Sequence, residues 1–171
     1  MELKNSPWSL LKKFPKSHRP KKSGDRSYIT INSGRGCSSV VGKQGRPQTL
    51  SLSGGCLSDG TIAHEFIHAL GFHHEQNRPD RDQYVKINFQ NIYSQNSFNF
   101  RKQSSSRVTT FGVPYDGLSI MHYRSTAFSK NRRPTIEAKP VSYWISRFYK
   151  VFQWIQFSYL RNFISIKFVL L

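Results

Sequence analysis

The sequence predicts one compact domain that combines short β-strands with helices. Its 171 residues suit a single domain, and the 37% apolar content, with 13 Phe and 8 Tyr, is enough to build a core. Apolar and polar residues alternate over 49–53, as they do in a half-buried strand. Residues 58–71 instead carry a capping side chain, a run of apolar positions and a terminal glycine, which is the pattern of a helix.

The first third of the chain is expected to contain a loose lead-in followed by three strands. Residues 1–26 are polar, basic and contain proline, so we expect little order there. Strand composition occurs at 28–31, more weakly at 39–41, and again at 49–53. A glycine follows each of the three stretches within a few residues, which favours a turn after each strand.

A helix is expected to begin at Ser58 or Asp59, because either side chain can cap it, and to end at Gly71. Its apolar positions are Ile62, Ala63, Phe66, Ile67 and Leu70. A second helix is predicted at about 89–102, and a turn is predicted at 113–117.

The tail, residues 140–171, is rich in aromatic and apolar residues and contains no acid. Its longest uncharged run, 151–160, is too short to span a bilayer, which takes about 20 residues. The tail could lie on a membrane surface as an amphipathic element. We favour the alternative, a poorly specified segment that would be adhesive if exposed.

The formal net charge of +17 suggests a nucleic-acid or membrane partner at first sight. The charge is concentrated toward the ends, because residues 1–36 carry +7, residues 37–139 carry +6 and residues 140–171 carry +4. No nucleic-acid-binding motif accompanies it. We therefore expect no nucleic-acid partner.

Cys37 and Cys56 are the two cysteines of the chain. They could be buried thiols or a disulfide. A disulfide would contribute roughly 3 kcal/mol through loop entropy and would imply an oxidising compartment. The N-terminal residues lack an apolar core segment, so a signal peptide is not predicted from them.

Histidines cluster in the stretch HEFIHALGFHHEQNRPDRD, which begins at His64. His64 and His68 are one helical turn apart, so both imidazoles leave the same face and can share one metal ion. Glu65 lies close to that face, where it can reach a metal-bound water without being a ligand.

A catalytic zinc site needs a third protein ligand and an open fourth position. A continued helix would carry His73 and His74 roughly 14–15 Å from His64 along its axis, so the helix must end first. Gly71 stands where a left-handed helix terminus would place a glycine, after which the chain can turn back. Local geometry does not decide between His73 and His74 as the third ligand.

The whole pattern resembles the astacin family of metzincin metalloproteases, whose motif is H-E-x-x-H-x-x-G-x-x-H-E-x-x-R-x-D-R-D. Every fixed position of that motif is matched, at His64, Glu65, His68, Gly71, His74, Glu75, Arg78, Asp80, Arg81 and Asp82. The stretch Ser119-Ile120-Met121-His122-Tyr123 is similar to the family's methionine turn. GCSSVVG, SLSGGCLSDGTIAHE and AFSKNRRPTI also look like the family, so the resemblance covers about 28–137.

The resemblance implies an α+β metzincin catalytic domain with a twisted sheet, an active-site helix and a methionine turn. It implies a zinc metalloendopeptidase that cleaves proteins or peptides and holds one Zn²⁺ per chain through His64, His68 and His74. Glu65 would take a proton from the zinc-bound water and pass it to the leaving amine. Tyr123 would bind zinc at rest and hydrogen-bond the tetrahedral oxyanion.

Further roles also follow from the resemblance. Met121 would form an apolar floor beneath the metal, Glu75 would meet a processed N-terminus through water, and Cys37 and Cys56 would form a family disulfide. His73 would pack or line the cleft. The remaining charged positions of the motif, Arg78, Asp80, Arg81 and Asp82, would form structural ion pairs.

The resemblance also predicts a secreted protein and an organisation in three parts. These are a lead-in at 1–26, a partial astacin-like domain at 27–139 and a divergent tail at 140–171. We expect both ends to be truncated and the C-terminal subdomain to be incomplete, because a second family disulfide and a propeptide are not recognisable. The alternative is an inactive zinc-binding fragment of the same family.

Overall fold

The computed structural model describes residues 21–140, which fall into two compact units that meet in sequence at Phe72 and His73. Each unit is described by itself. Most of the expected lead-in and nearly all of the tail, with its expected membrane contact, lie outside the described residues. Within 21–140, no helix has the length and apolar character needed to cross a membrane.

The first unit contains a three-stranded sheet of β1 (Ile29–Asn32), β2 (Cys37–Ser39) and β3 (Gln48–Leu52). The strand order is β1-β3-β2, with β1 parallel and β2 antiparallel to the central β3. Two of the three predicted strands are confirmed with a shift of one residue.

The strand predicted at 39–41 is displaced, because β2 pairs from Cys37 to Ser39. Val40 and Val41 instead lead into a turn in which the Gly42 amide donates a hydrogen bond to His68 O over 2.8 Å. The backbone follows that hydrogen bond and leaves the edge of β3.

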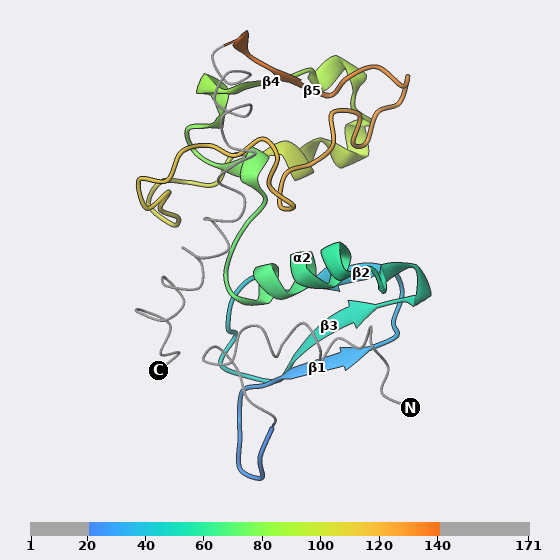
Figure 1. The fold of residues 1–171 in the computed structure, drawn as a ribbon, viewed down its shortest axis with the longest axis vertical. Helices are drawn as coiled ribbons and strands as arrows, with labels where there is room; N and C mark the ends of the chain where they lie inside the picture. The colour runs from blue at the N-terminus through green and yellow to red at the C-terminus, as the bar shows by residue number, and fades with distance from the viewer. Residues whose placement is uncertain (1–20, 141–171) are drawn as a thin grey trace. The chain divides into compact units, whose positions relative to one another are not determined.

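The predicted first helix is confirmed as α2 (Asp59–Ala69), which packs on β2 and β3 (Figure 1). Ser58 is its N-cap, and its hydroxyl accepts a hydrogen bond from Thr61 N. The core between helix and sheet is apolar and consists of Leu50, Leu52, Cys56 and Ile62, with Ile31 and Phe66 packed against it.

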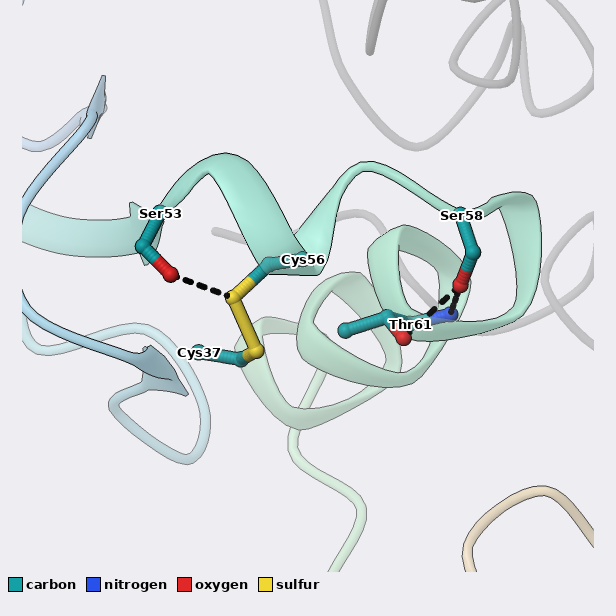
Figure 2. Close-up of a disulfide and its surroundings, with 5 residues drawn as sticks. All are labelled: Cys37, Ser53, Cys56, Ser58 and Thr61. Atoms are coloured by element: carbon teal, nitrogen blue, oxygen red, sulfur yellow. Dashed lines mark hydrogen bonds between the residues drawn. A yellow bond between two sulfur atoms is a disulfide. The ribbon is translucent and has the colours of Figure 1, made fainter.

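A disulfide joins Cys37 at the start of β2 to Cys56 at the end of the short 3-10 helix η1 (Gly54–Cys56). Figure 2 shows the bridge beside the N-terminus of α2, with Ser53 Oγ 3.2 Å from Cys56 Sγ. Cys56 is buried in the core, so the bridge attaches an exposed strand end to the packed interior.

The second unit is built from short elements. They are η2 (Glu75–Asn77), η3 (Arg81–Gln83), β4 (Val85–Ile87), η4 (Phe89–Asn91), η5 (Ser94–Phe100) and β5 (Ile136–Ala138). Strands β4 and β5 pair antiparallel. The buried core consists of Val85, Ile92, Phe100, Tyr115, Ala127 and Ile136.

The second predicted helix, at 89–102, is wrong as an α-helix. The segment is instead two 3-10 helices, separated by Ile92 in an extended conformation. The Asn91 side chain donates to Pro134 O over 2.7 Å, and Ile92 forms a β-bridge with Ser129. These contacts with a distant segment stabilise a break that the local apolar pattern does not reveal.

Candidate metal centre

His64 and His68 leave the last two turns of α2 on one face, with ring centroids 4.7 Å apart. His68 is buried and its Nδ1 lies 2.8 Å from Phe72 O. Because a carbonyl oxygen can only accept, Nδ1 carries the proton and the lone pair of Nε2 is available to a metal. This hydrogen bond fixes the tautomer and the ring orientation of His68.

The helix ends at Gly71, as the sequence predicts. Gly71 has φ +106°, a conformation that favours glycine, and its amide donates to His68 O over 2.9 Å. The amide of Gly42 donates to the same carbonyl, so two backbone donors fix the last turn. The chain then departs from the helix direction just before His74.

The ligand nitrogens of His64, His68 and His74 lie within 4.8 Å of one another. The choice that local sequence geometry left open is therefore made by the fold, in favour of His74. His73 is exposed and lines a neighbouring cavity, and desolvation lowers the pKa of its imidazole, which favours the neutral form.

Glu65 provides a test of whether a metal fits these residues. Its side chain is buried, and Oε2 has no hydrogen-bond partner within residues 21–140. Burial raises the pKa of Glu65, and the neighbouring His64 lowers it to a smaller extent. An unsatisfied buried carboxylate oxygen is costly, and a water held beside a metal would satisfy it. Three imidazole donors with a carboxylate beside them are a donor set that suits zinc.

Tyr123 lies against His74, with ring centroids 4.5 Å apart. Its amide donates to Gln76 Oε1 over 3.0 Å, and the Glu75 amide donates to Met121 O over 3.0 Å. The turn that contains Met121 and Tyr123 is therefore hydrogen-bonded to the residues that follow His74. Burial raises the pKa of Tyr123, so its hydroxyl stays protonated at neutral pH.

His122 lies between Met121 and Tyr123 in sequence but makes a different set of contacts. Its Nδ1 lies 2.6 Å from Tyr123 O, so Nδ1 donates and Nε2 accepts a hydrogen bond from the Tyr115 hydroxyl over 2.7 Å. Desolvation lowers the pKa of His122, in keeping with a neutral imidazole. This is the packed histidine that the sequence led us to expect.

The acidic and basic residues after His74 form the expected ion pairs. Arg78 donates to Glu75 Oε1 over 3.0 Å and to Asp80 Oδ2 over 2.8 Å, while the Asp116 amide also donates to Glu75 Oε1. Burial raises the pKa of Glu75 despite these contacts. The buried Arg81 donates to Gln76 O and Phe100 O as well as to Asp82.

Sequence reasoning missed a cavity of about 320 Å³ beside His74 and Tyr123. Its other lining residues are His73, Asn77, Phe98, Asn99, Arg101 and Gln103. The one local signal is the alternation of Asn99, Arg101 and Gln103 around the buried Phe100, and this signal is weak without knowledge of the contacts across the chain.

The α+β fold and the three clustered imidazoles define a metzincin-type zinc-binding domain. Comparison with solved structures supports the fold. High choriolytic enzyme 1, a hatching enzyme zinc-protease from medaka fish (Oryzias latipes), superposes with a TM-score of 0.71 at 38% identity. The match covers 78% of this chain and 68% of that one.

Sequence comparisons give the family. The family model of the astacin peptidases matches residues 14–146, so the chain belongs to the astacin family. Zinc metalloproteinase nas-13 of Caenorhabditis elegans is 50% identical over 118 residues, and Blastula protease 10 of Paracentrotus lividus is 47% identical over 124 residues. These matches cover 69% and 72% of this chain, but only 26% and 21% of the relatives.

Proposed function

We propose that the chain carries the catalytic centre of a zinc metalloendopeptidase that hydrolyses peptide bonds in proteins or peptides. The observation that supports this proposal most directly is the cluster of three imidazole nitrogens next to the buried, unpartnered Oε2 of Glu65. The names of the relatives, which include zinc metalloproteinases and choriolytic enzymes, agree with it.

His64, His68 and His74 would hold one Zn²⁺ per chain. When bound, zinc supplies a Lewis acid that polarises the scissile carbonyl and lowers the pKa of water. The His68 imidazole is held for this task by its hydrogen bond to Phe72 O.

Glu65 is proposed as the general base, because its unpartnered oxygen can accept a proton from the attacking water. The same carboxyl group would then deliver that proton to the leaving amine. Tyr123 is proposed as the donor to the oxyanion, since its hydroxyl is protonated at neutral pH. Met121, Gly71 and Glu75 would support the site structurally.

The expected location is extracellular. The Cys37–Cys56 disulfide is the structural feature that supports it, because disulfides persist in oxidising compartments.

The test is cleavage of a denatured, internally quenched protein substrate by the purified chain with zinc supplied. Glu65→Gln should lower kcat/KM by roughly 10²–10⁴-fold, the range for loss of a general base, while zinc content stays at one per chain. Tyr123→Phe should lower kcat more than it raises KM, since the hydroxyl acts in the transition state. A folded, zinc-loaded chain with no activity would contradict the proposal.

A further inference from the structure

The cavity beside His74 and Tyr123 has a wall that is fixed to the metal-ligand segment. Asn77, three residues after His74, donates from its side-chain amide to Asn99 O over 2.9 Å and also to Arg101 O. The Gln103 amide donates back to Asn77 O over 2.7 Å. The backbone of 99–103 is therefore anchored beside the proposed reacting groups.

Side chains alternate along this wall. Phe100 is fully buried and its carbonyl accepts from Arg81, whereas Asn99, Arg101 and Gln103 line the cavity. Arg101 has an extended backbone, which places residues on either side of it on opposite faces from its own side chain. The guanidinium is thus part of the cavity lining and is not directed into the core.

The charge of the cavity is set by Arg101. It is the one lining residue with a permanent charge, and the other polar groups are amides, imidazoles and the Tyr123 hydroxyl. The neighbouring Lys102 is paired with Asp82 over 2.7 Å. Within residues 21–140, by contrast, no carboxylate lies within ion-pair distance of Arg101.

We propose that this cavity is a substrate side-chain subsite and that Arg101 makes it selective for a carboxylate side chain. A guanidinium binds a carboxylate through two parallel N–H···O bonds, and the amide groups of Asn99 and Gln103 add further donors. The inference rests on the proposed proteolytic function, because the subsite adjoins the residues assigned to it. A lysine or arginine side chain of the substrate would be disfavoured by like charge.

The experiment compares quenched peptides that differ at one position, with Glu, Gln or Lys scanned on both sides of the cleaved bond. The zinc-loaded full chain should prefer Glu over Gln at one position by roughly tenfold in kcat/KM, equivalent to one charge-assisted hydrogen-bonded pair. Arg101→Gln should remove that preference, and Arg101→Glu should reverse it toward Lys. Lys102→Gln is the matched control, and it should keep the preference.

A binding measurement separates failure of the inference from failure of the proposed function. Glu65→Gln, which should not turn substrate over, is titrated with fluorescent Glu and Gln peptides, and the pair of Kd values is compared with that of Glu65→Gln combined with Arg101→Gln. Tighter binding of the Glu peptide that depends on Arg101 supports the subsite even without cleavage. A preference that is absent, or that survives Arg101→Gln, in cleavage or in binding, overturns it.

Discussion

His73 and His74 differ by one position in sequence, yet the cluster of ligand nitrogens contains His74 and not His73. The difference arises from backbone direction after Gly71, where φ is +106°. His73 instead lines the cavity. At the scale of single residues, the fold therefore assigns different roles to two identical side chains.

We predict that His74→Ala weakens zinc binding by more than roughly 100-fold, the upper range for loss of a mere outer-shell partner. His73→Ala should bind zinc nearly as well as the parent chain, because its imidazole is not in the cluster. Competition with a chelator of known affinity gives both constants. Equal losses in the two variants would contradict the assignment.

Asp80 gives a residue-scale prediction about pH. The hydrogen bond from Arg78 holds the pKa of Asp80 below its ordinary value, against a smaller opposing effect of burial. A lowered folded-state pKa means that the contribution to stability is present above the unfolded pKa of about 3.9 and is lost as the pH falls below it.

Asp80→Asn should therefore unfold more easily than the parent chain at pH 7, and the difference should shrink as the pH falls below about 4. Urea unfolding of both zinc-free proteins at several pH values measures it. A difference in the free energy of unfolding that is independent of pH would show that the Arg78 contact is not its source.

At the scale of elements, local signals in the sequence predicted what local physics determines. The cap at Ser58, the apolar face of α2 and the glycine at its end are all short-range features, and the structure contains each of them. The pairing of Val85 with Ala138 is a long-range feature that no local pattern indicates. The predicted helix at 89–102 failed for the same reason, because Asn91 is held by Pro134.

The candidate site divides in the same way. The spacing of His64, Glu65 and His68 identifies the helical half from the sequence alone, while the choice of His74 needed the family resemblance. The cavity wall was not predictable, because it depends on hydrogen bonds from Asn77 to residues 22 and 24 positions away.

Two glycines on α2 or at its end test the element-scale argument against each other. Gly71→Ala should destabilise the chain by about 1–3 kcal/mol, since a side chain is strained at φ +106°. Gly60→Ala should stabilise it by about 0.4–1 kcal/mol, because Gly60 lies in the first turn of α2 with open space around it.

The two variants are compared by chemical unfolding without zinc and then by zinc affinity. Gly71→Ala should also weaken zinc binding, because it disturbs the turn that leads to His74. Gly60→Ala should leave zinc affinity unchanged. If Gly71→Ala were as stable as the parent chain, the positive φ would not be required by the fold.

At the scale of the molecule, two units are stabilised by different chemistry. Residues 21–72 combine a small apolar core with one disulfide, while the unit that begins at His73 relies on buried polar contacts such as those of Arg81 and Asn91. The chain also carries a net charge of +17, whose self-repulsion opposes the compact state. A covalent link is therefore expected to matter more here than in a larger, less charged domain.

The Cys37–Cys56 bridge spans a sequence separation of 19, for which the loop-entropy model gives about 3 kcal/mol. Reduction by a phosphine should therefore lower the Tm of the zinc-free chain by roughly 6–12 °C. The double variant Cys37→Ser with Cys56→Ser should already show the lower Tm and should not respond to reductant. If thiol titration showed two reduced cysteines and the Tm were unchanged, the sheet and α2 alone would be sufficient to hold the first unit, because the bridge constrains only the unfolded chain that they compete against.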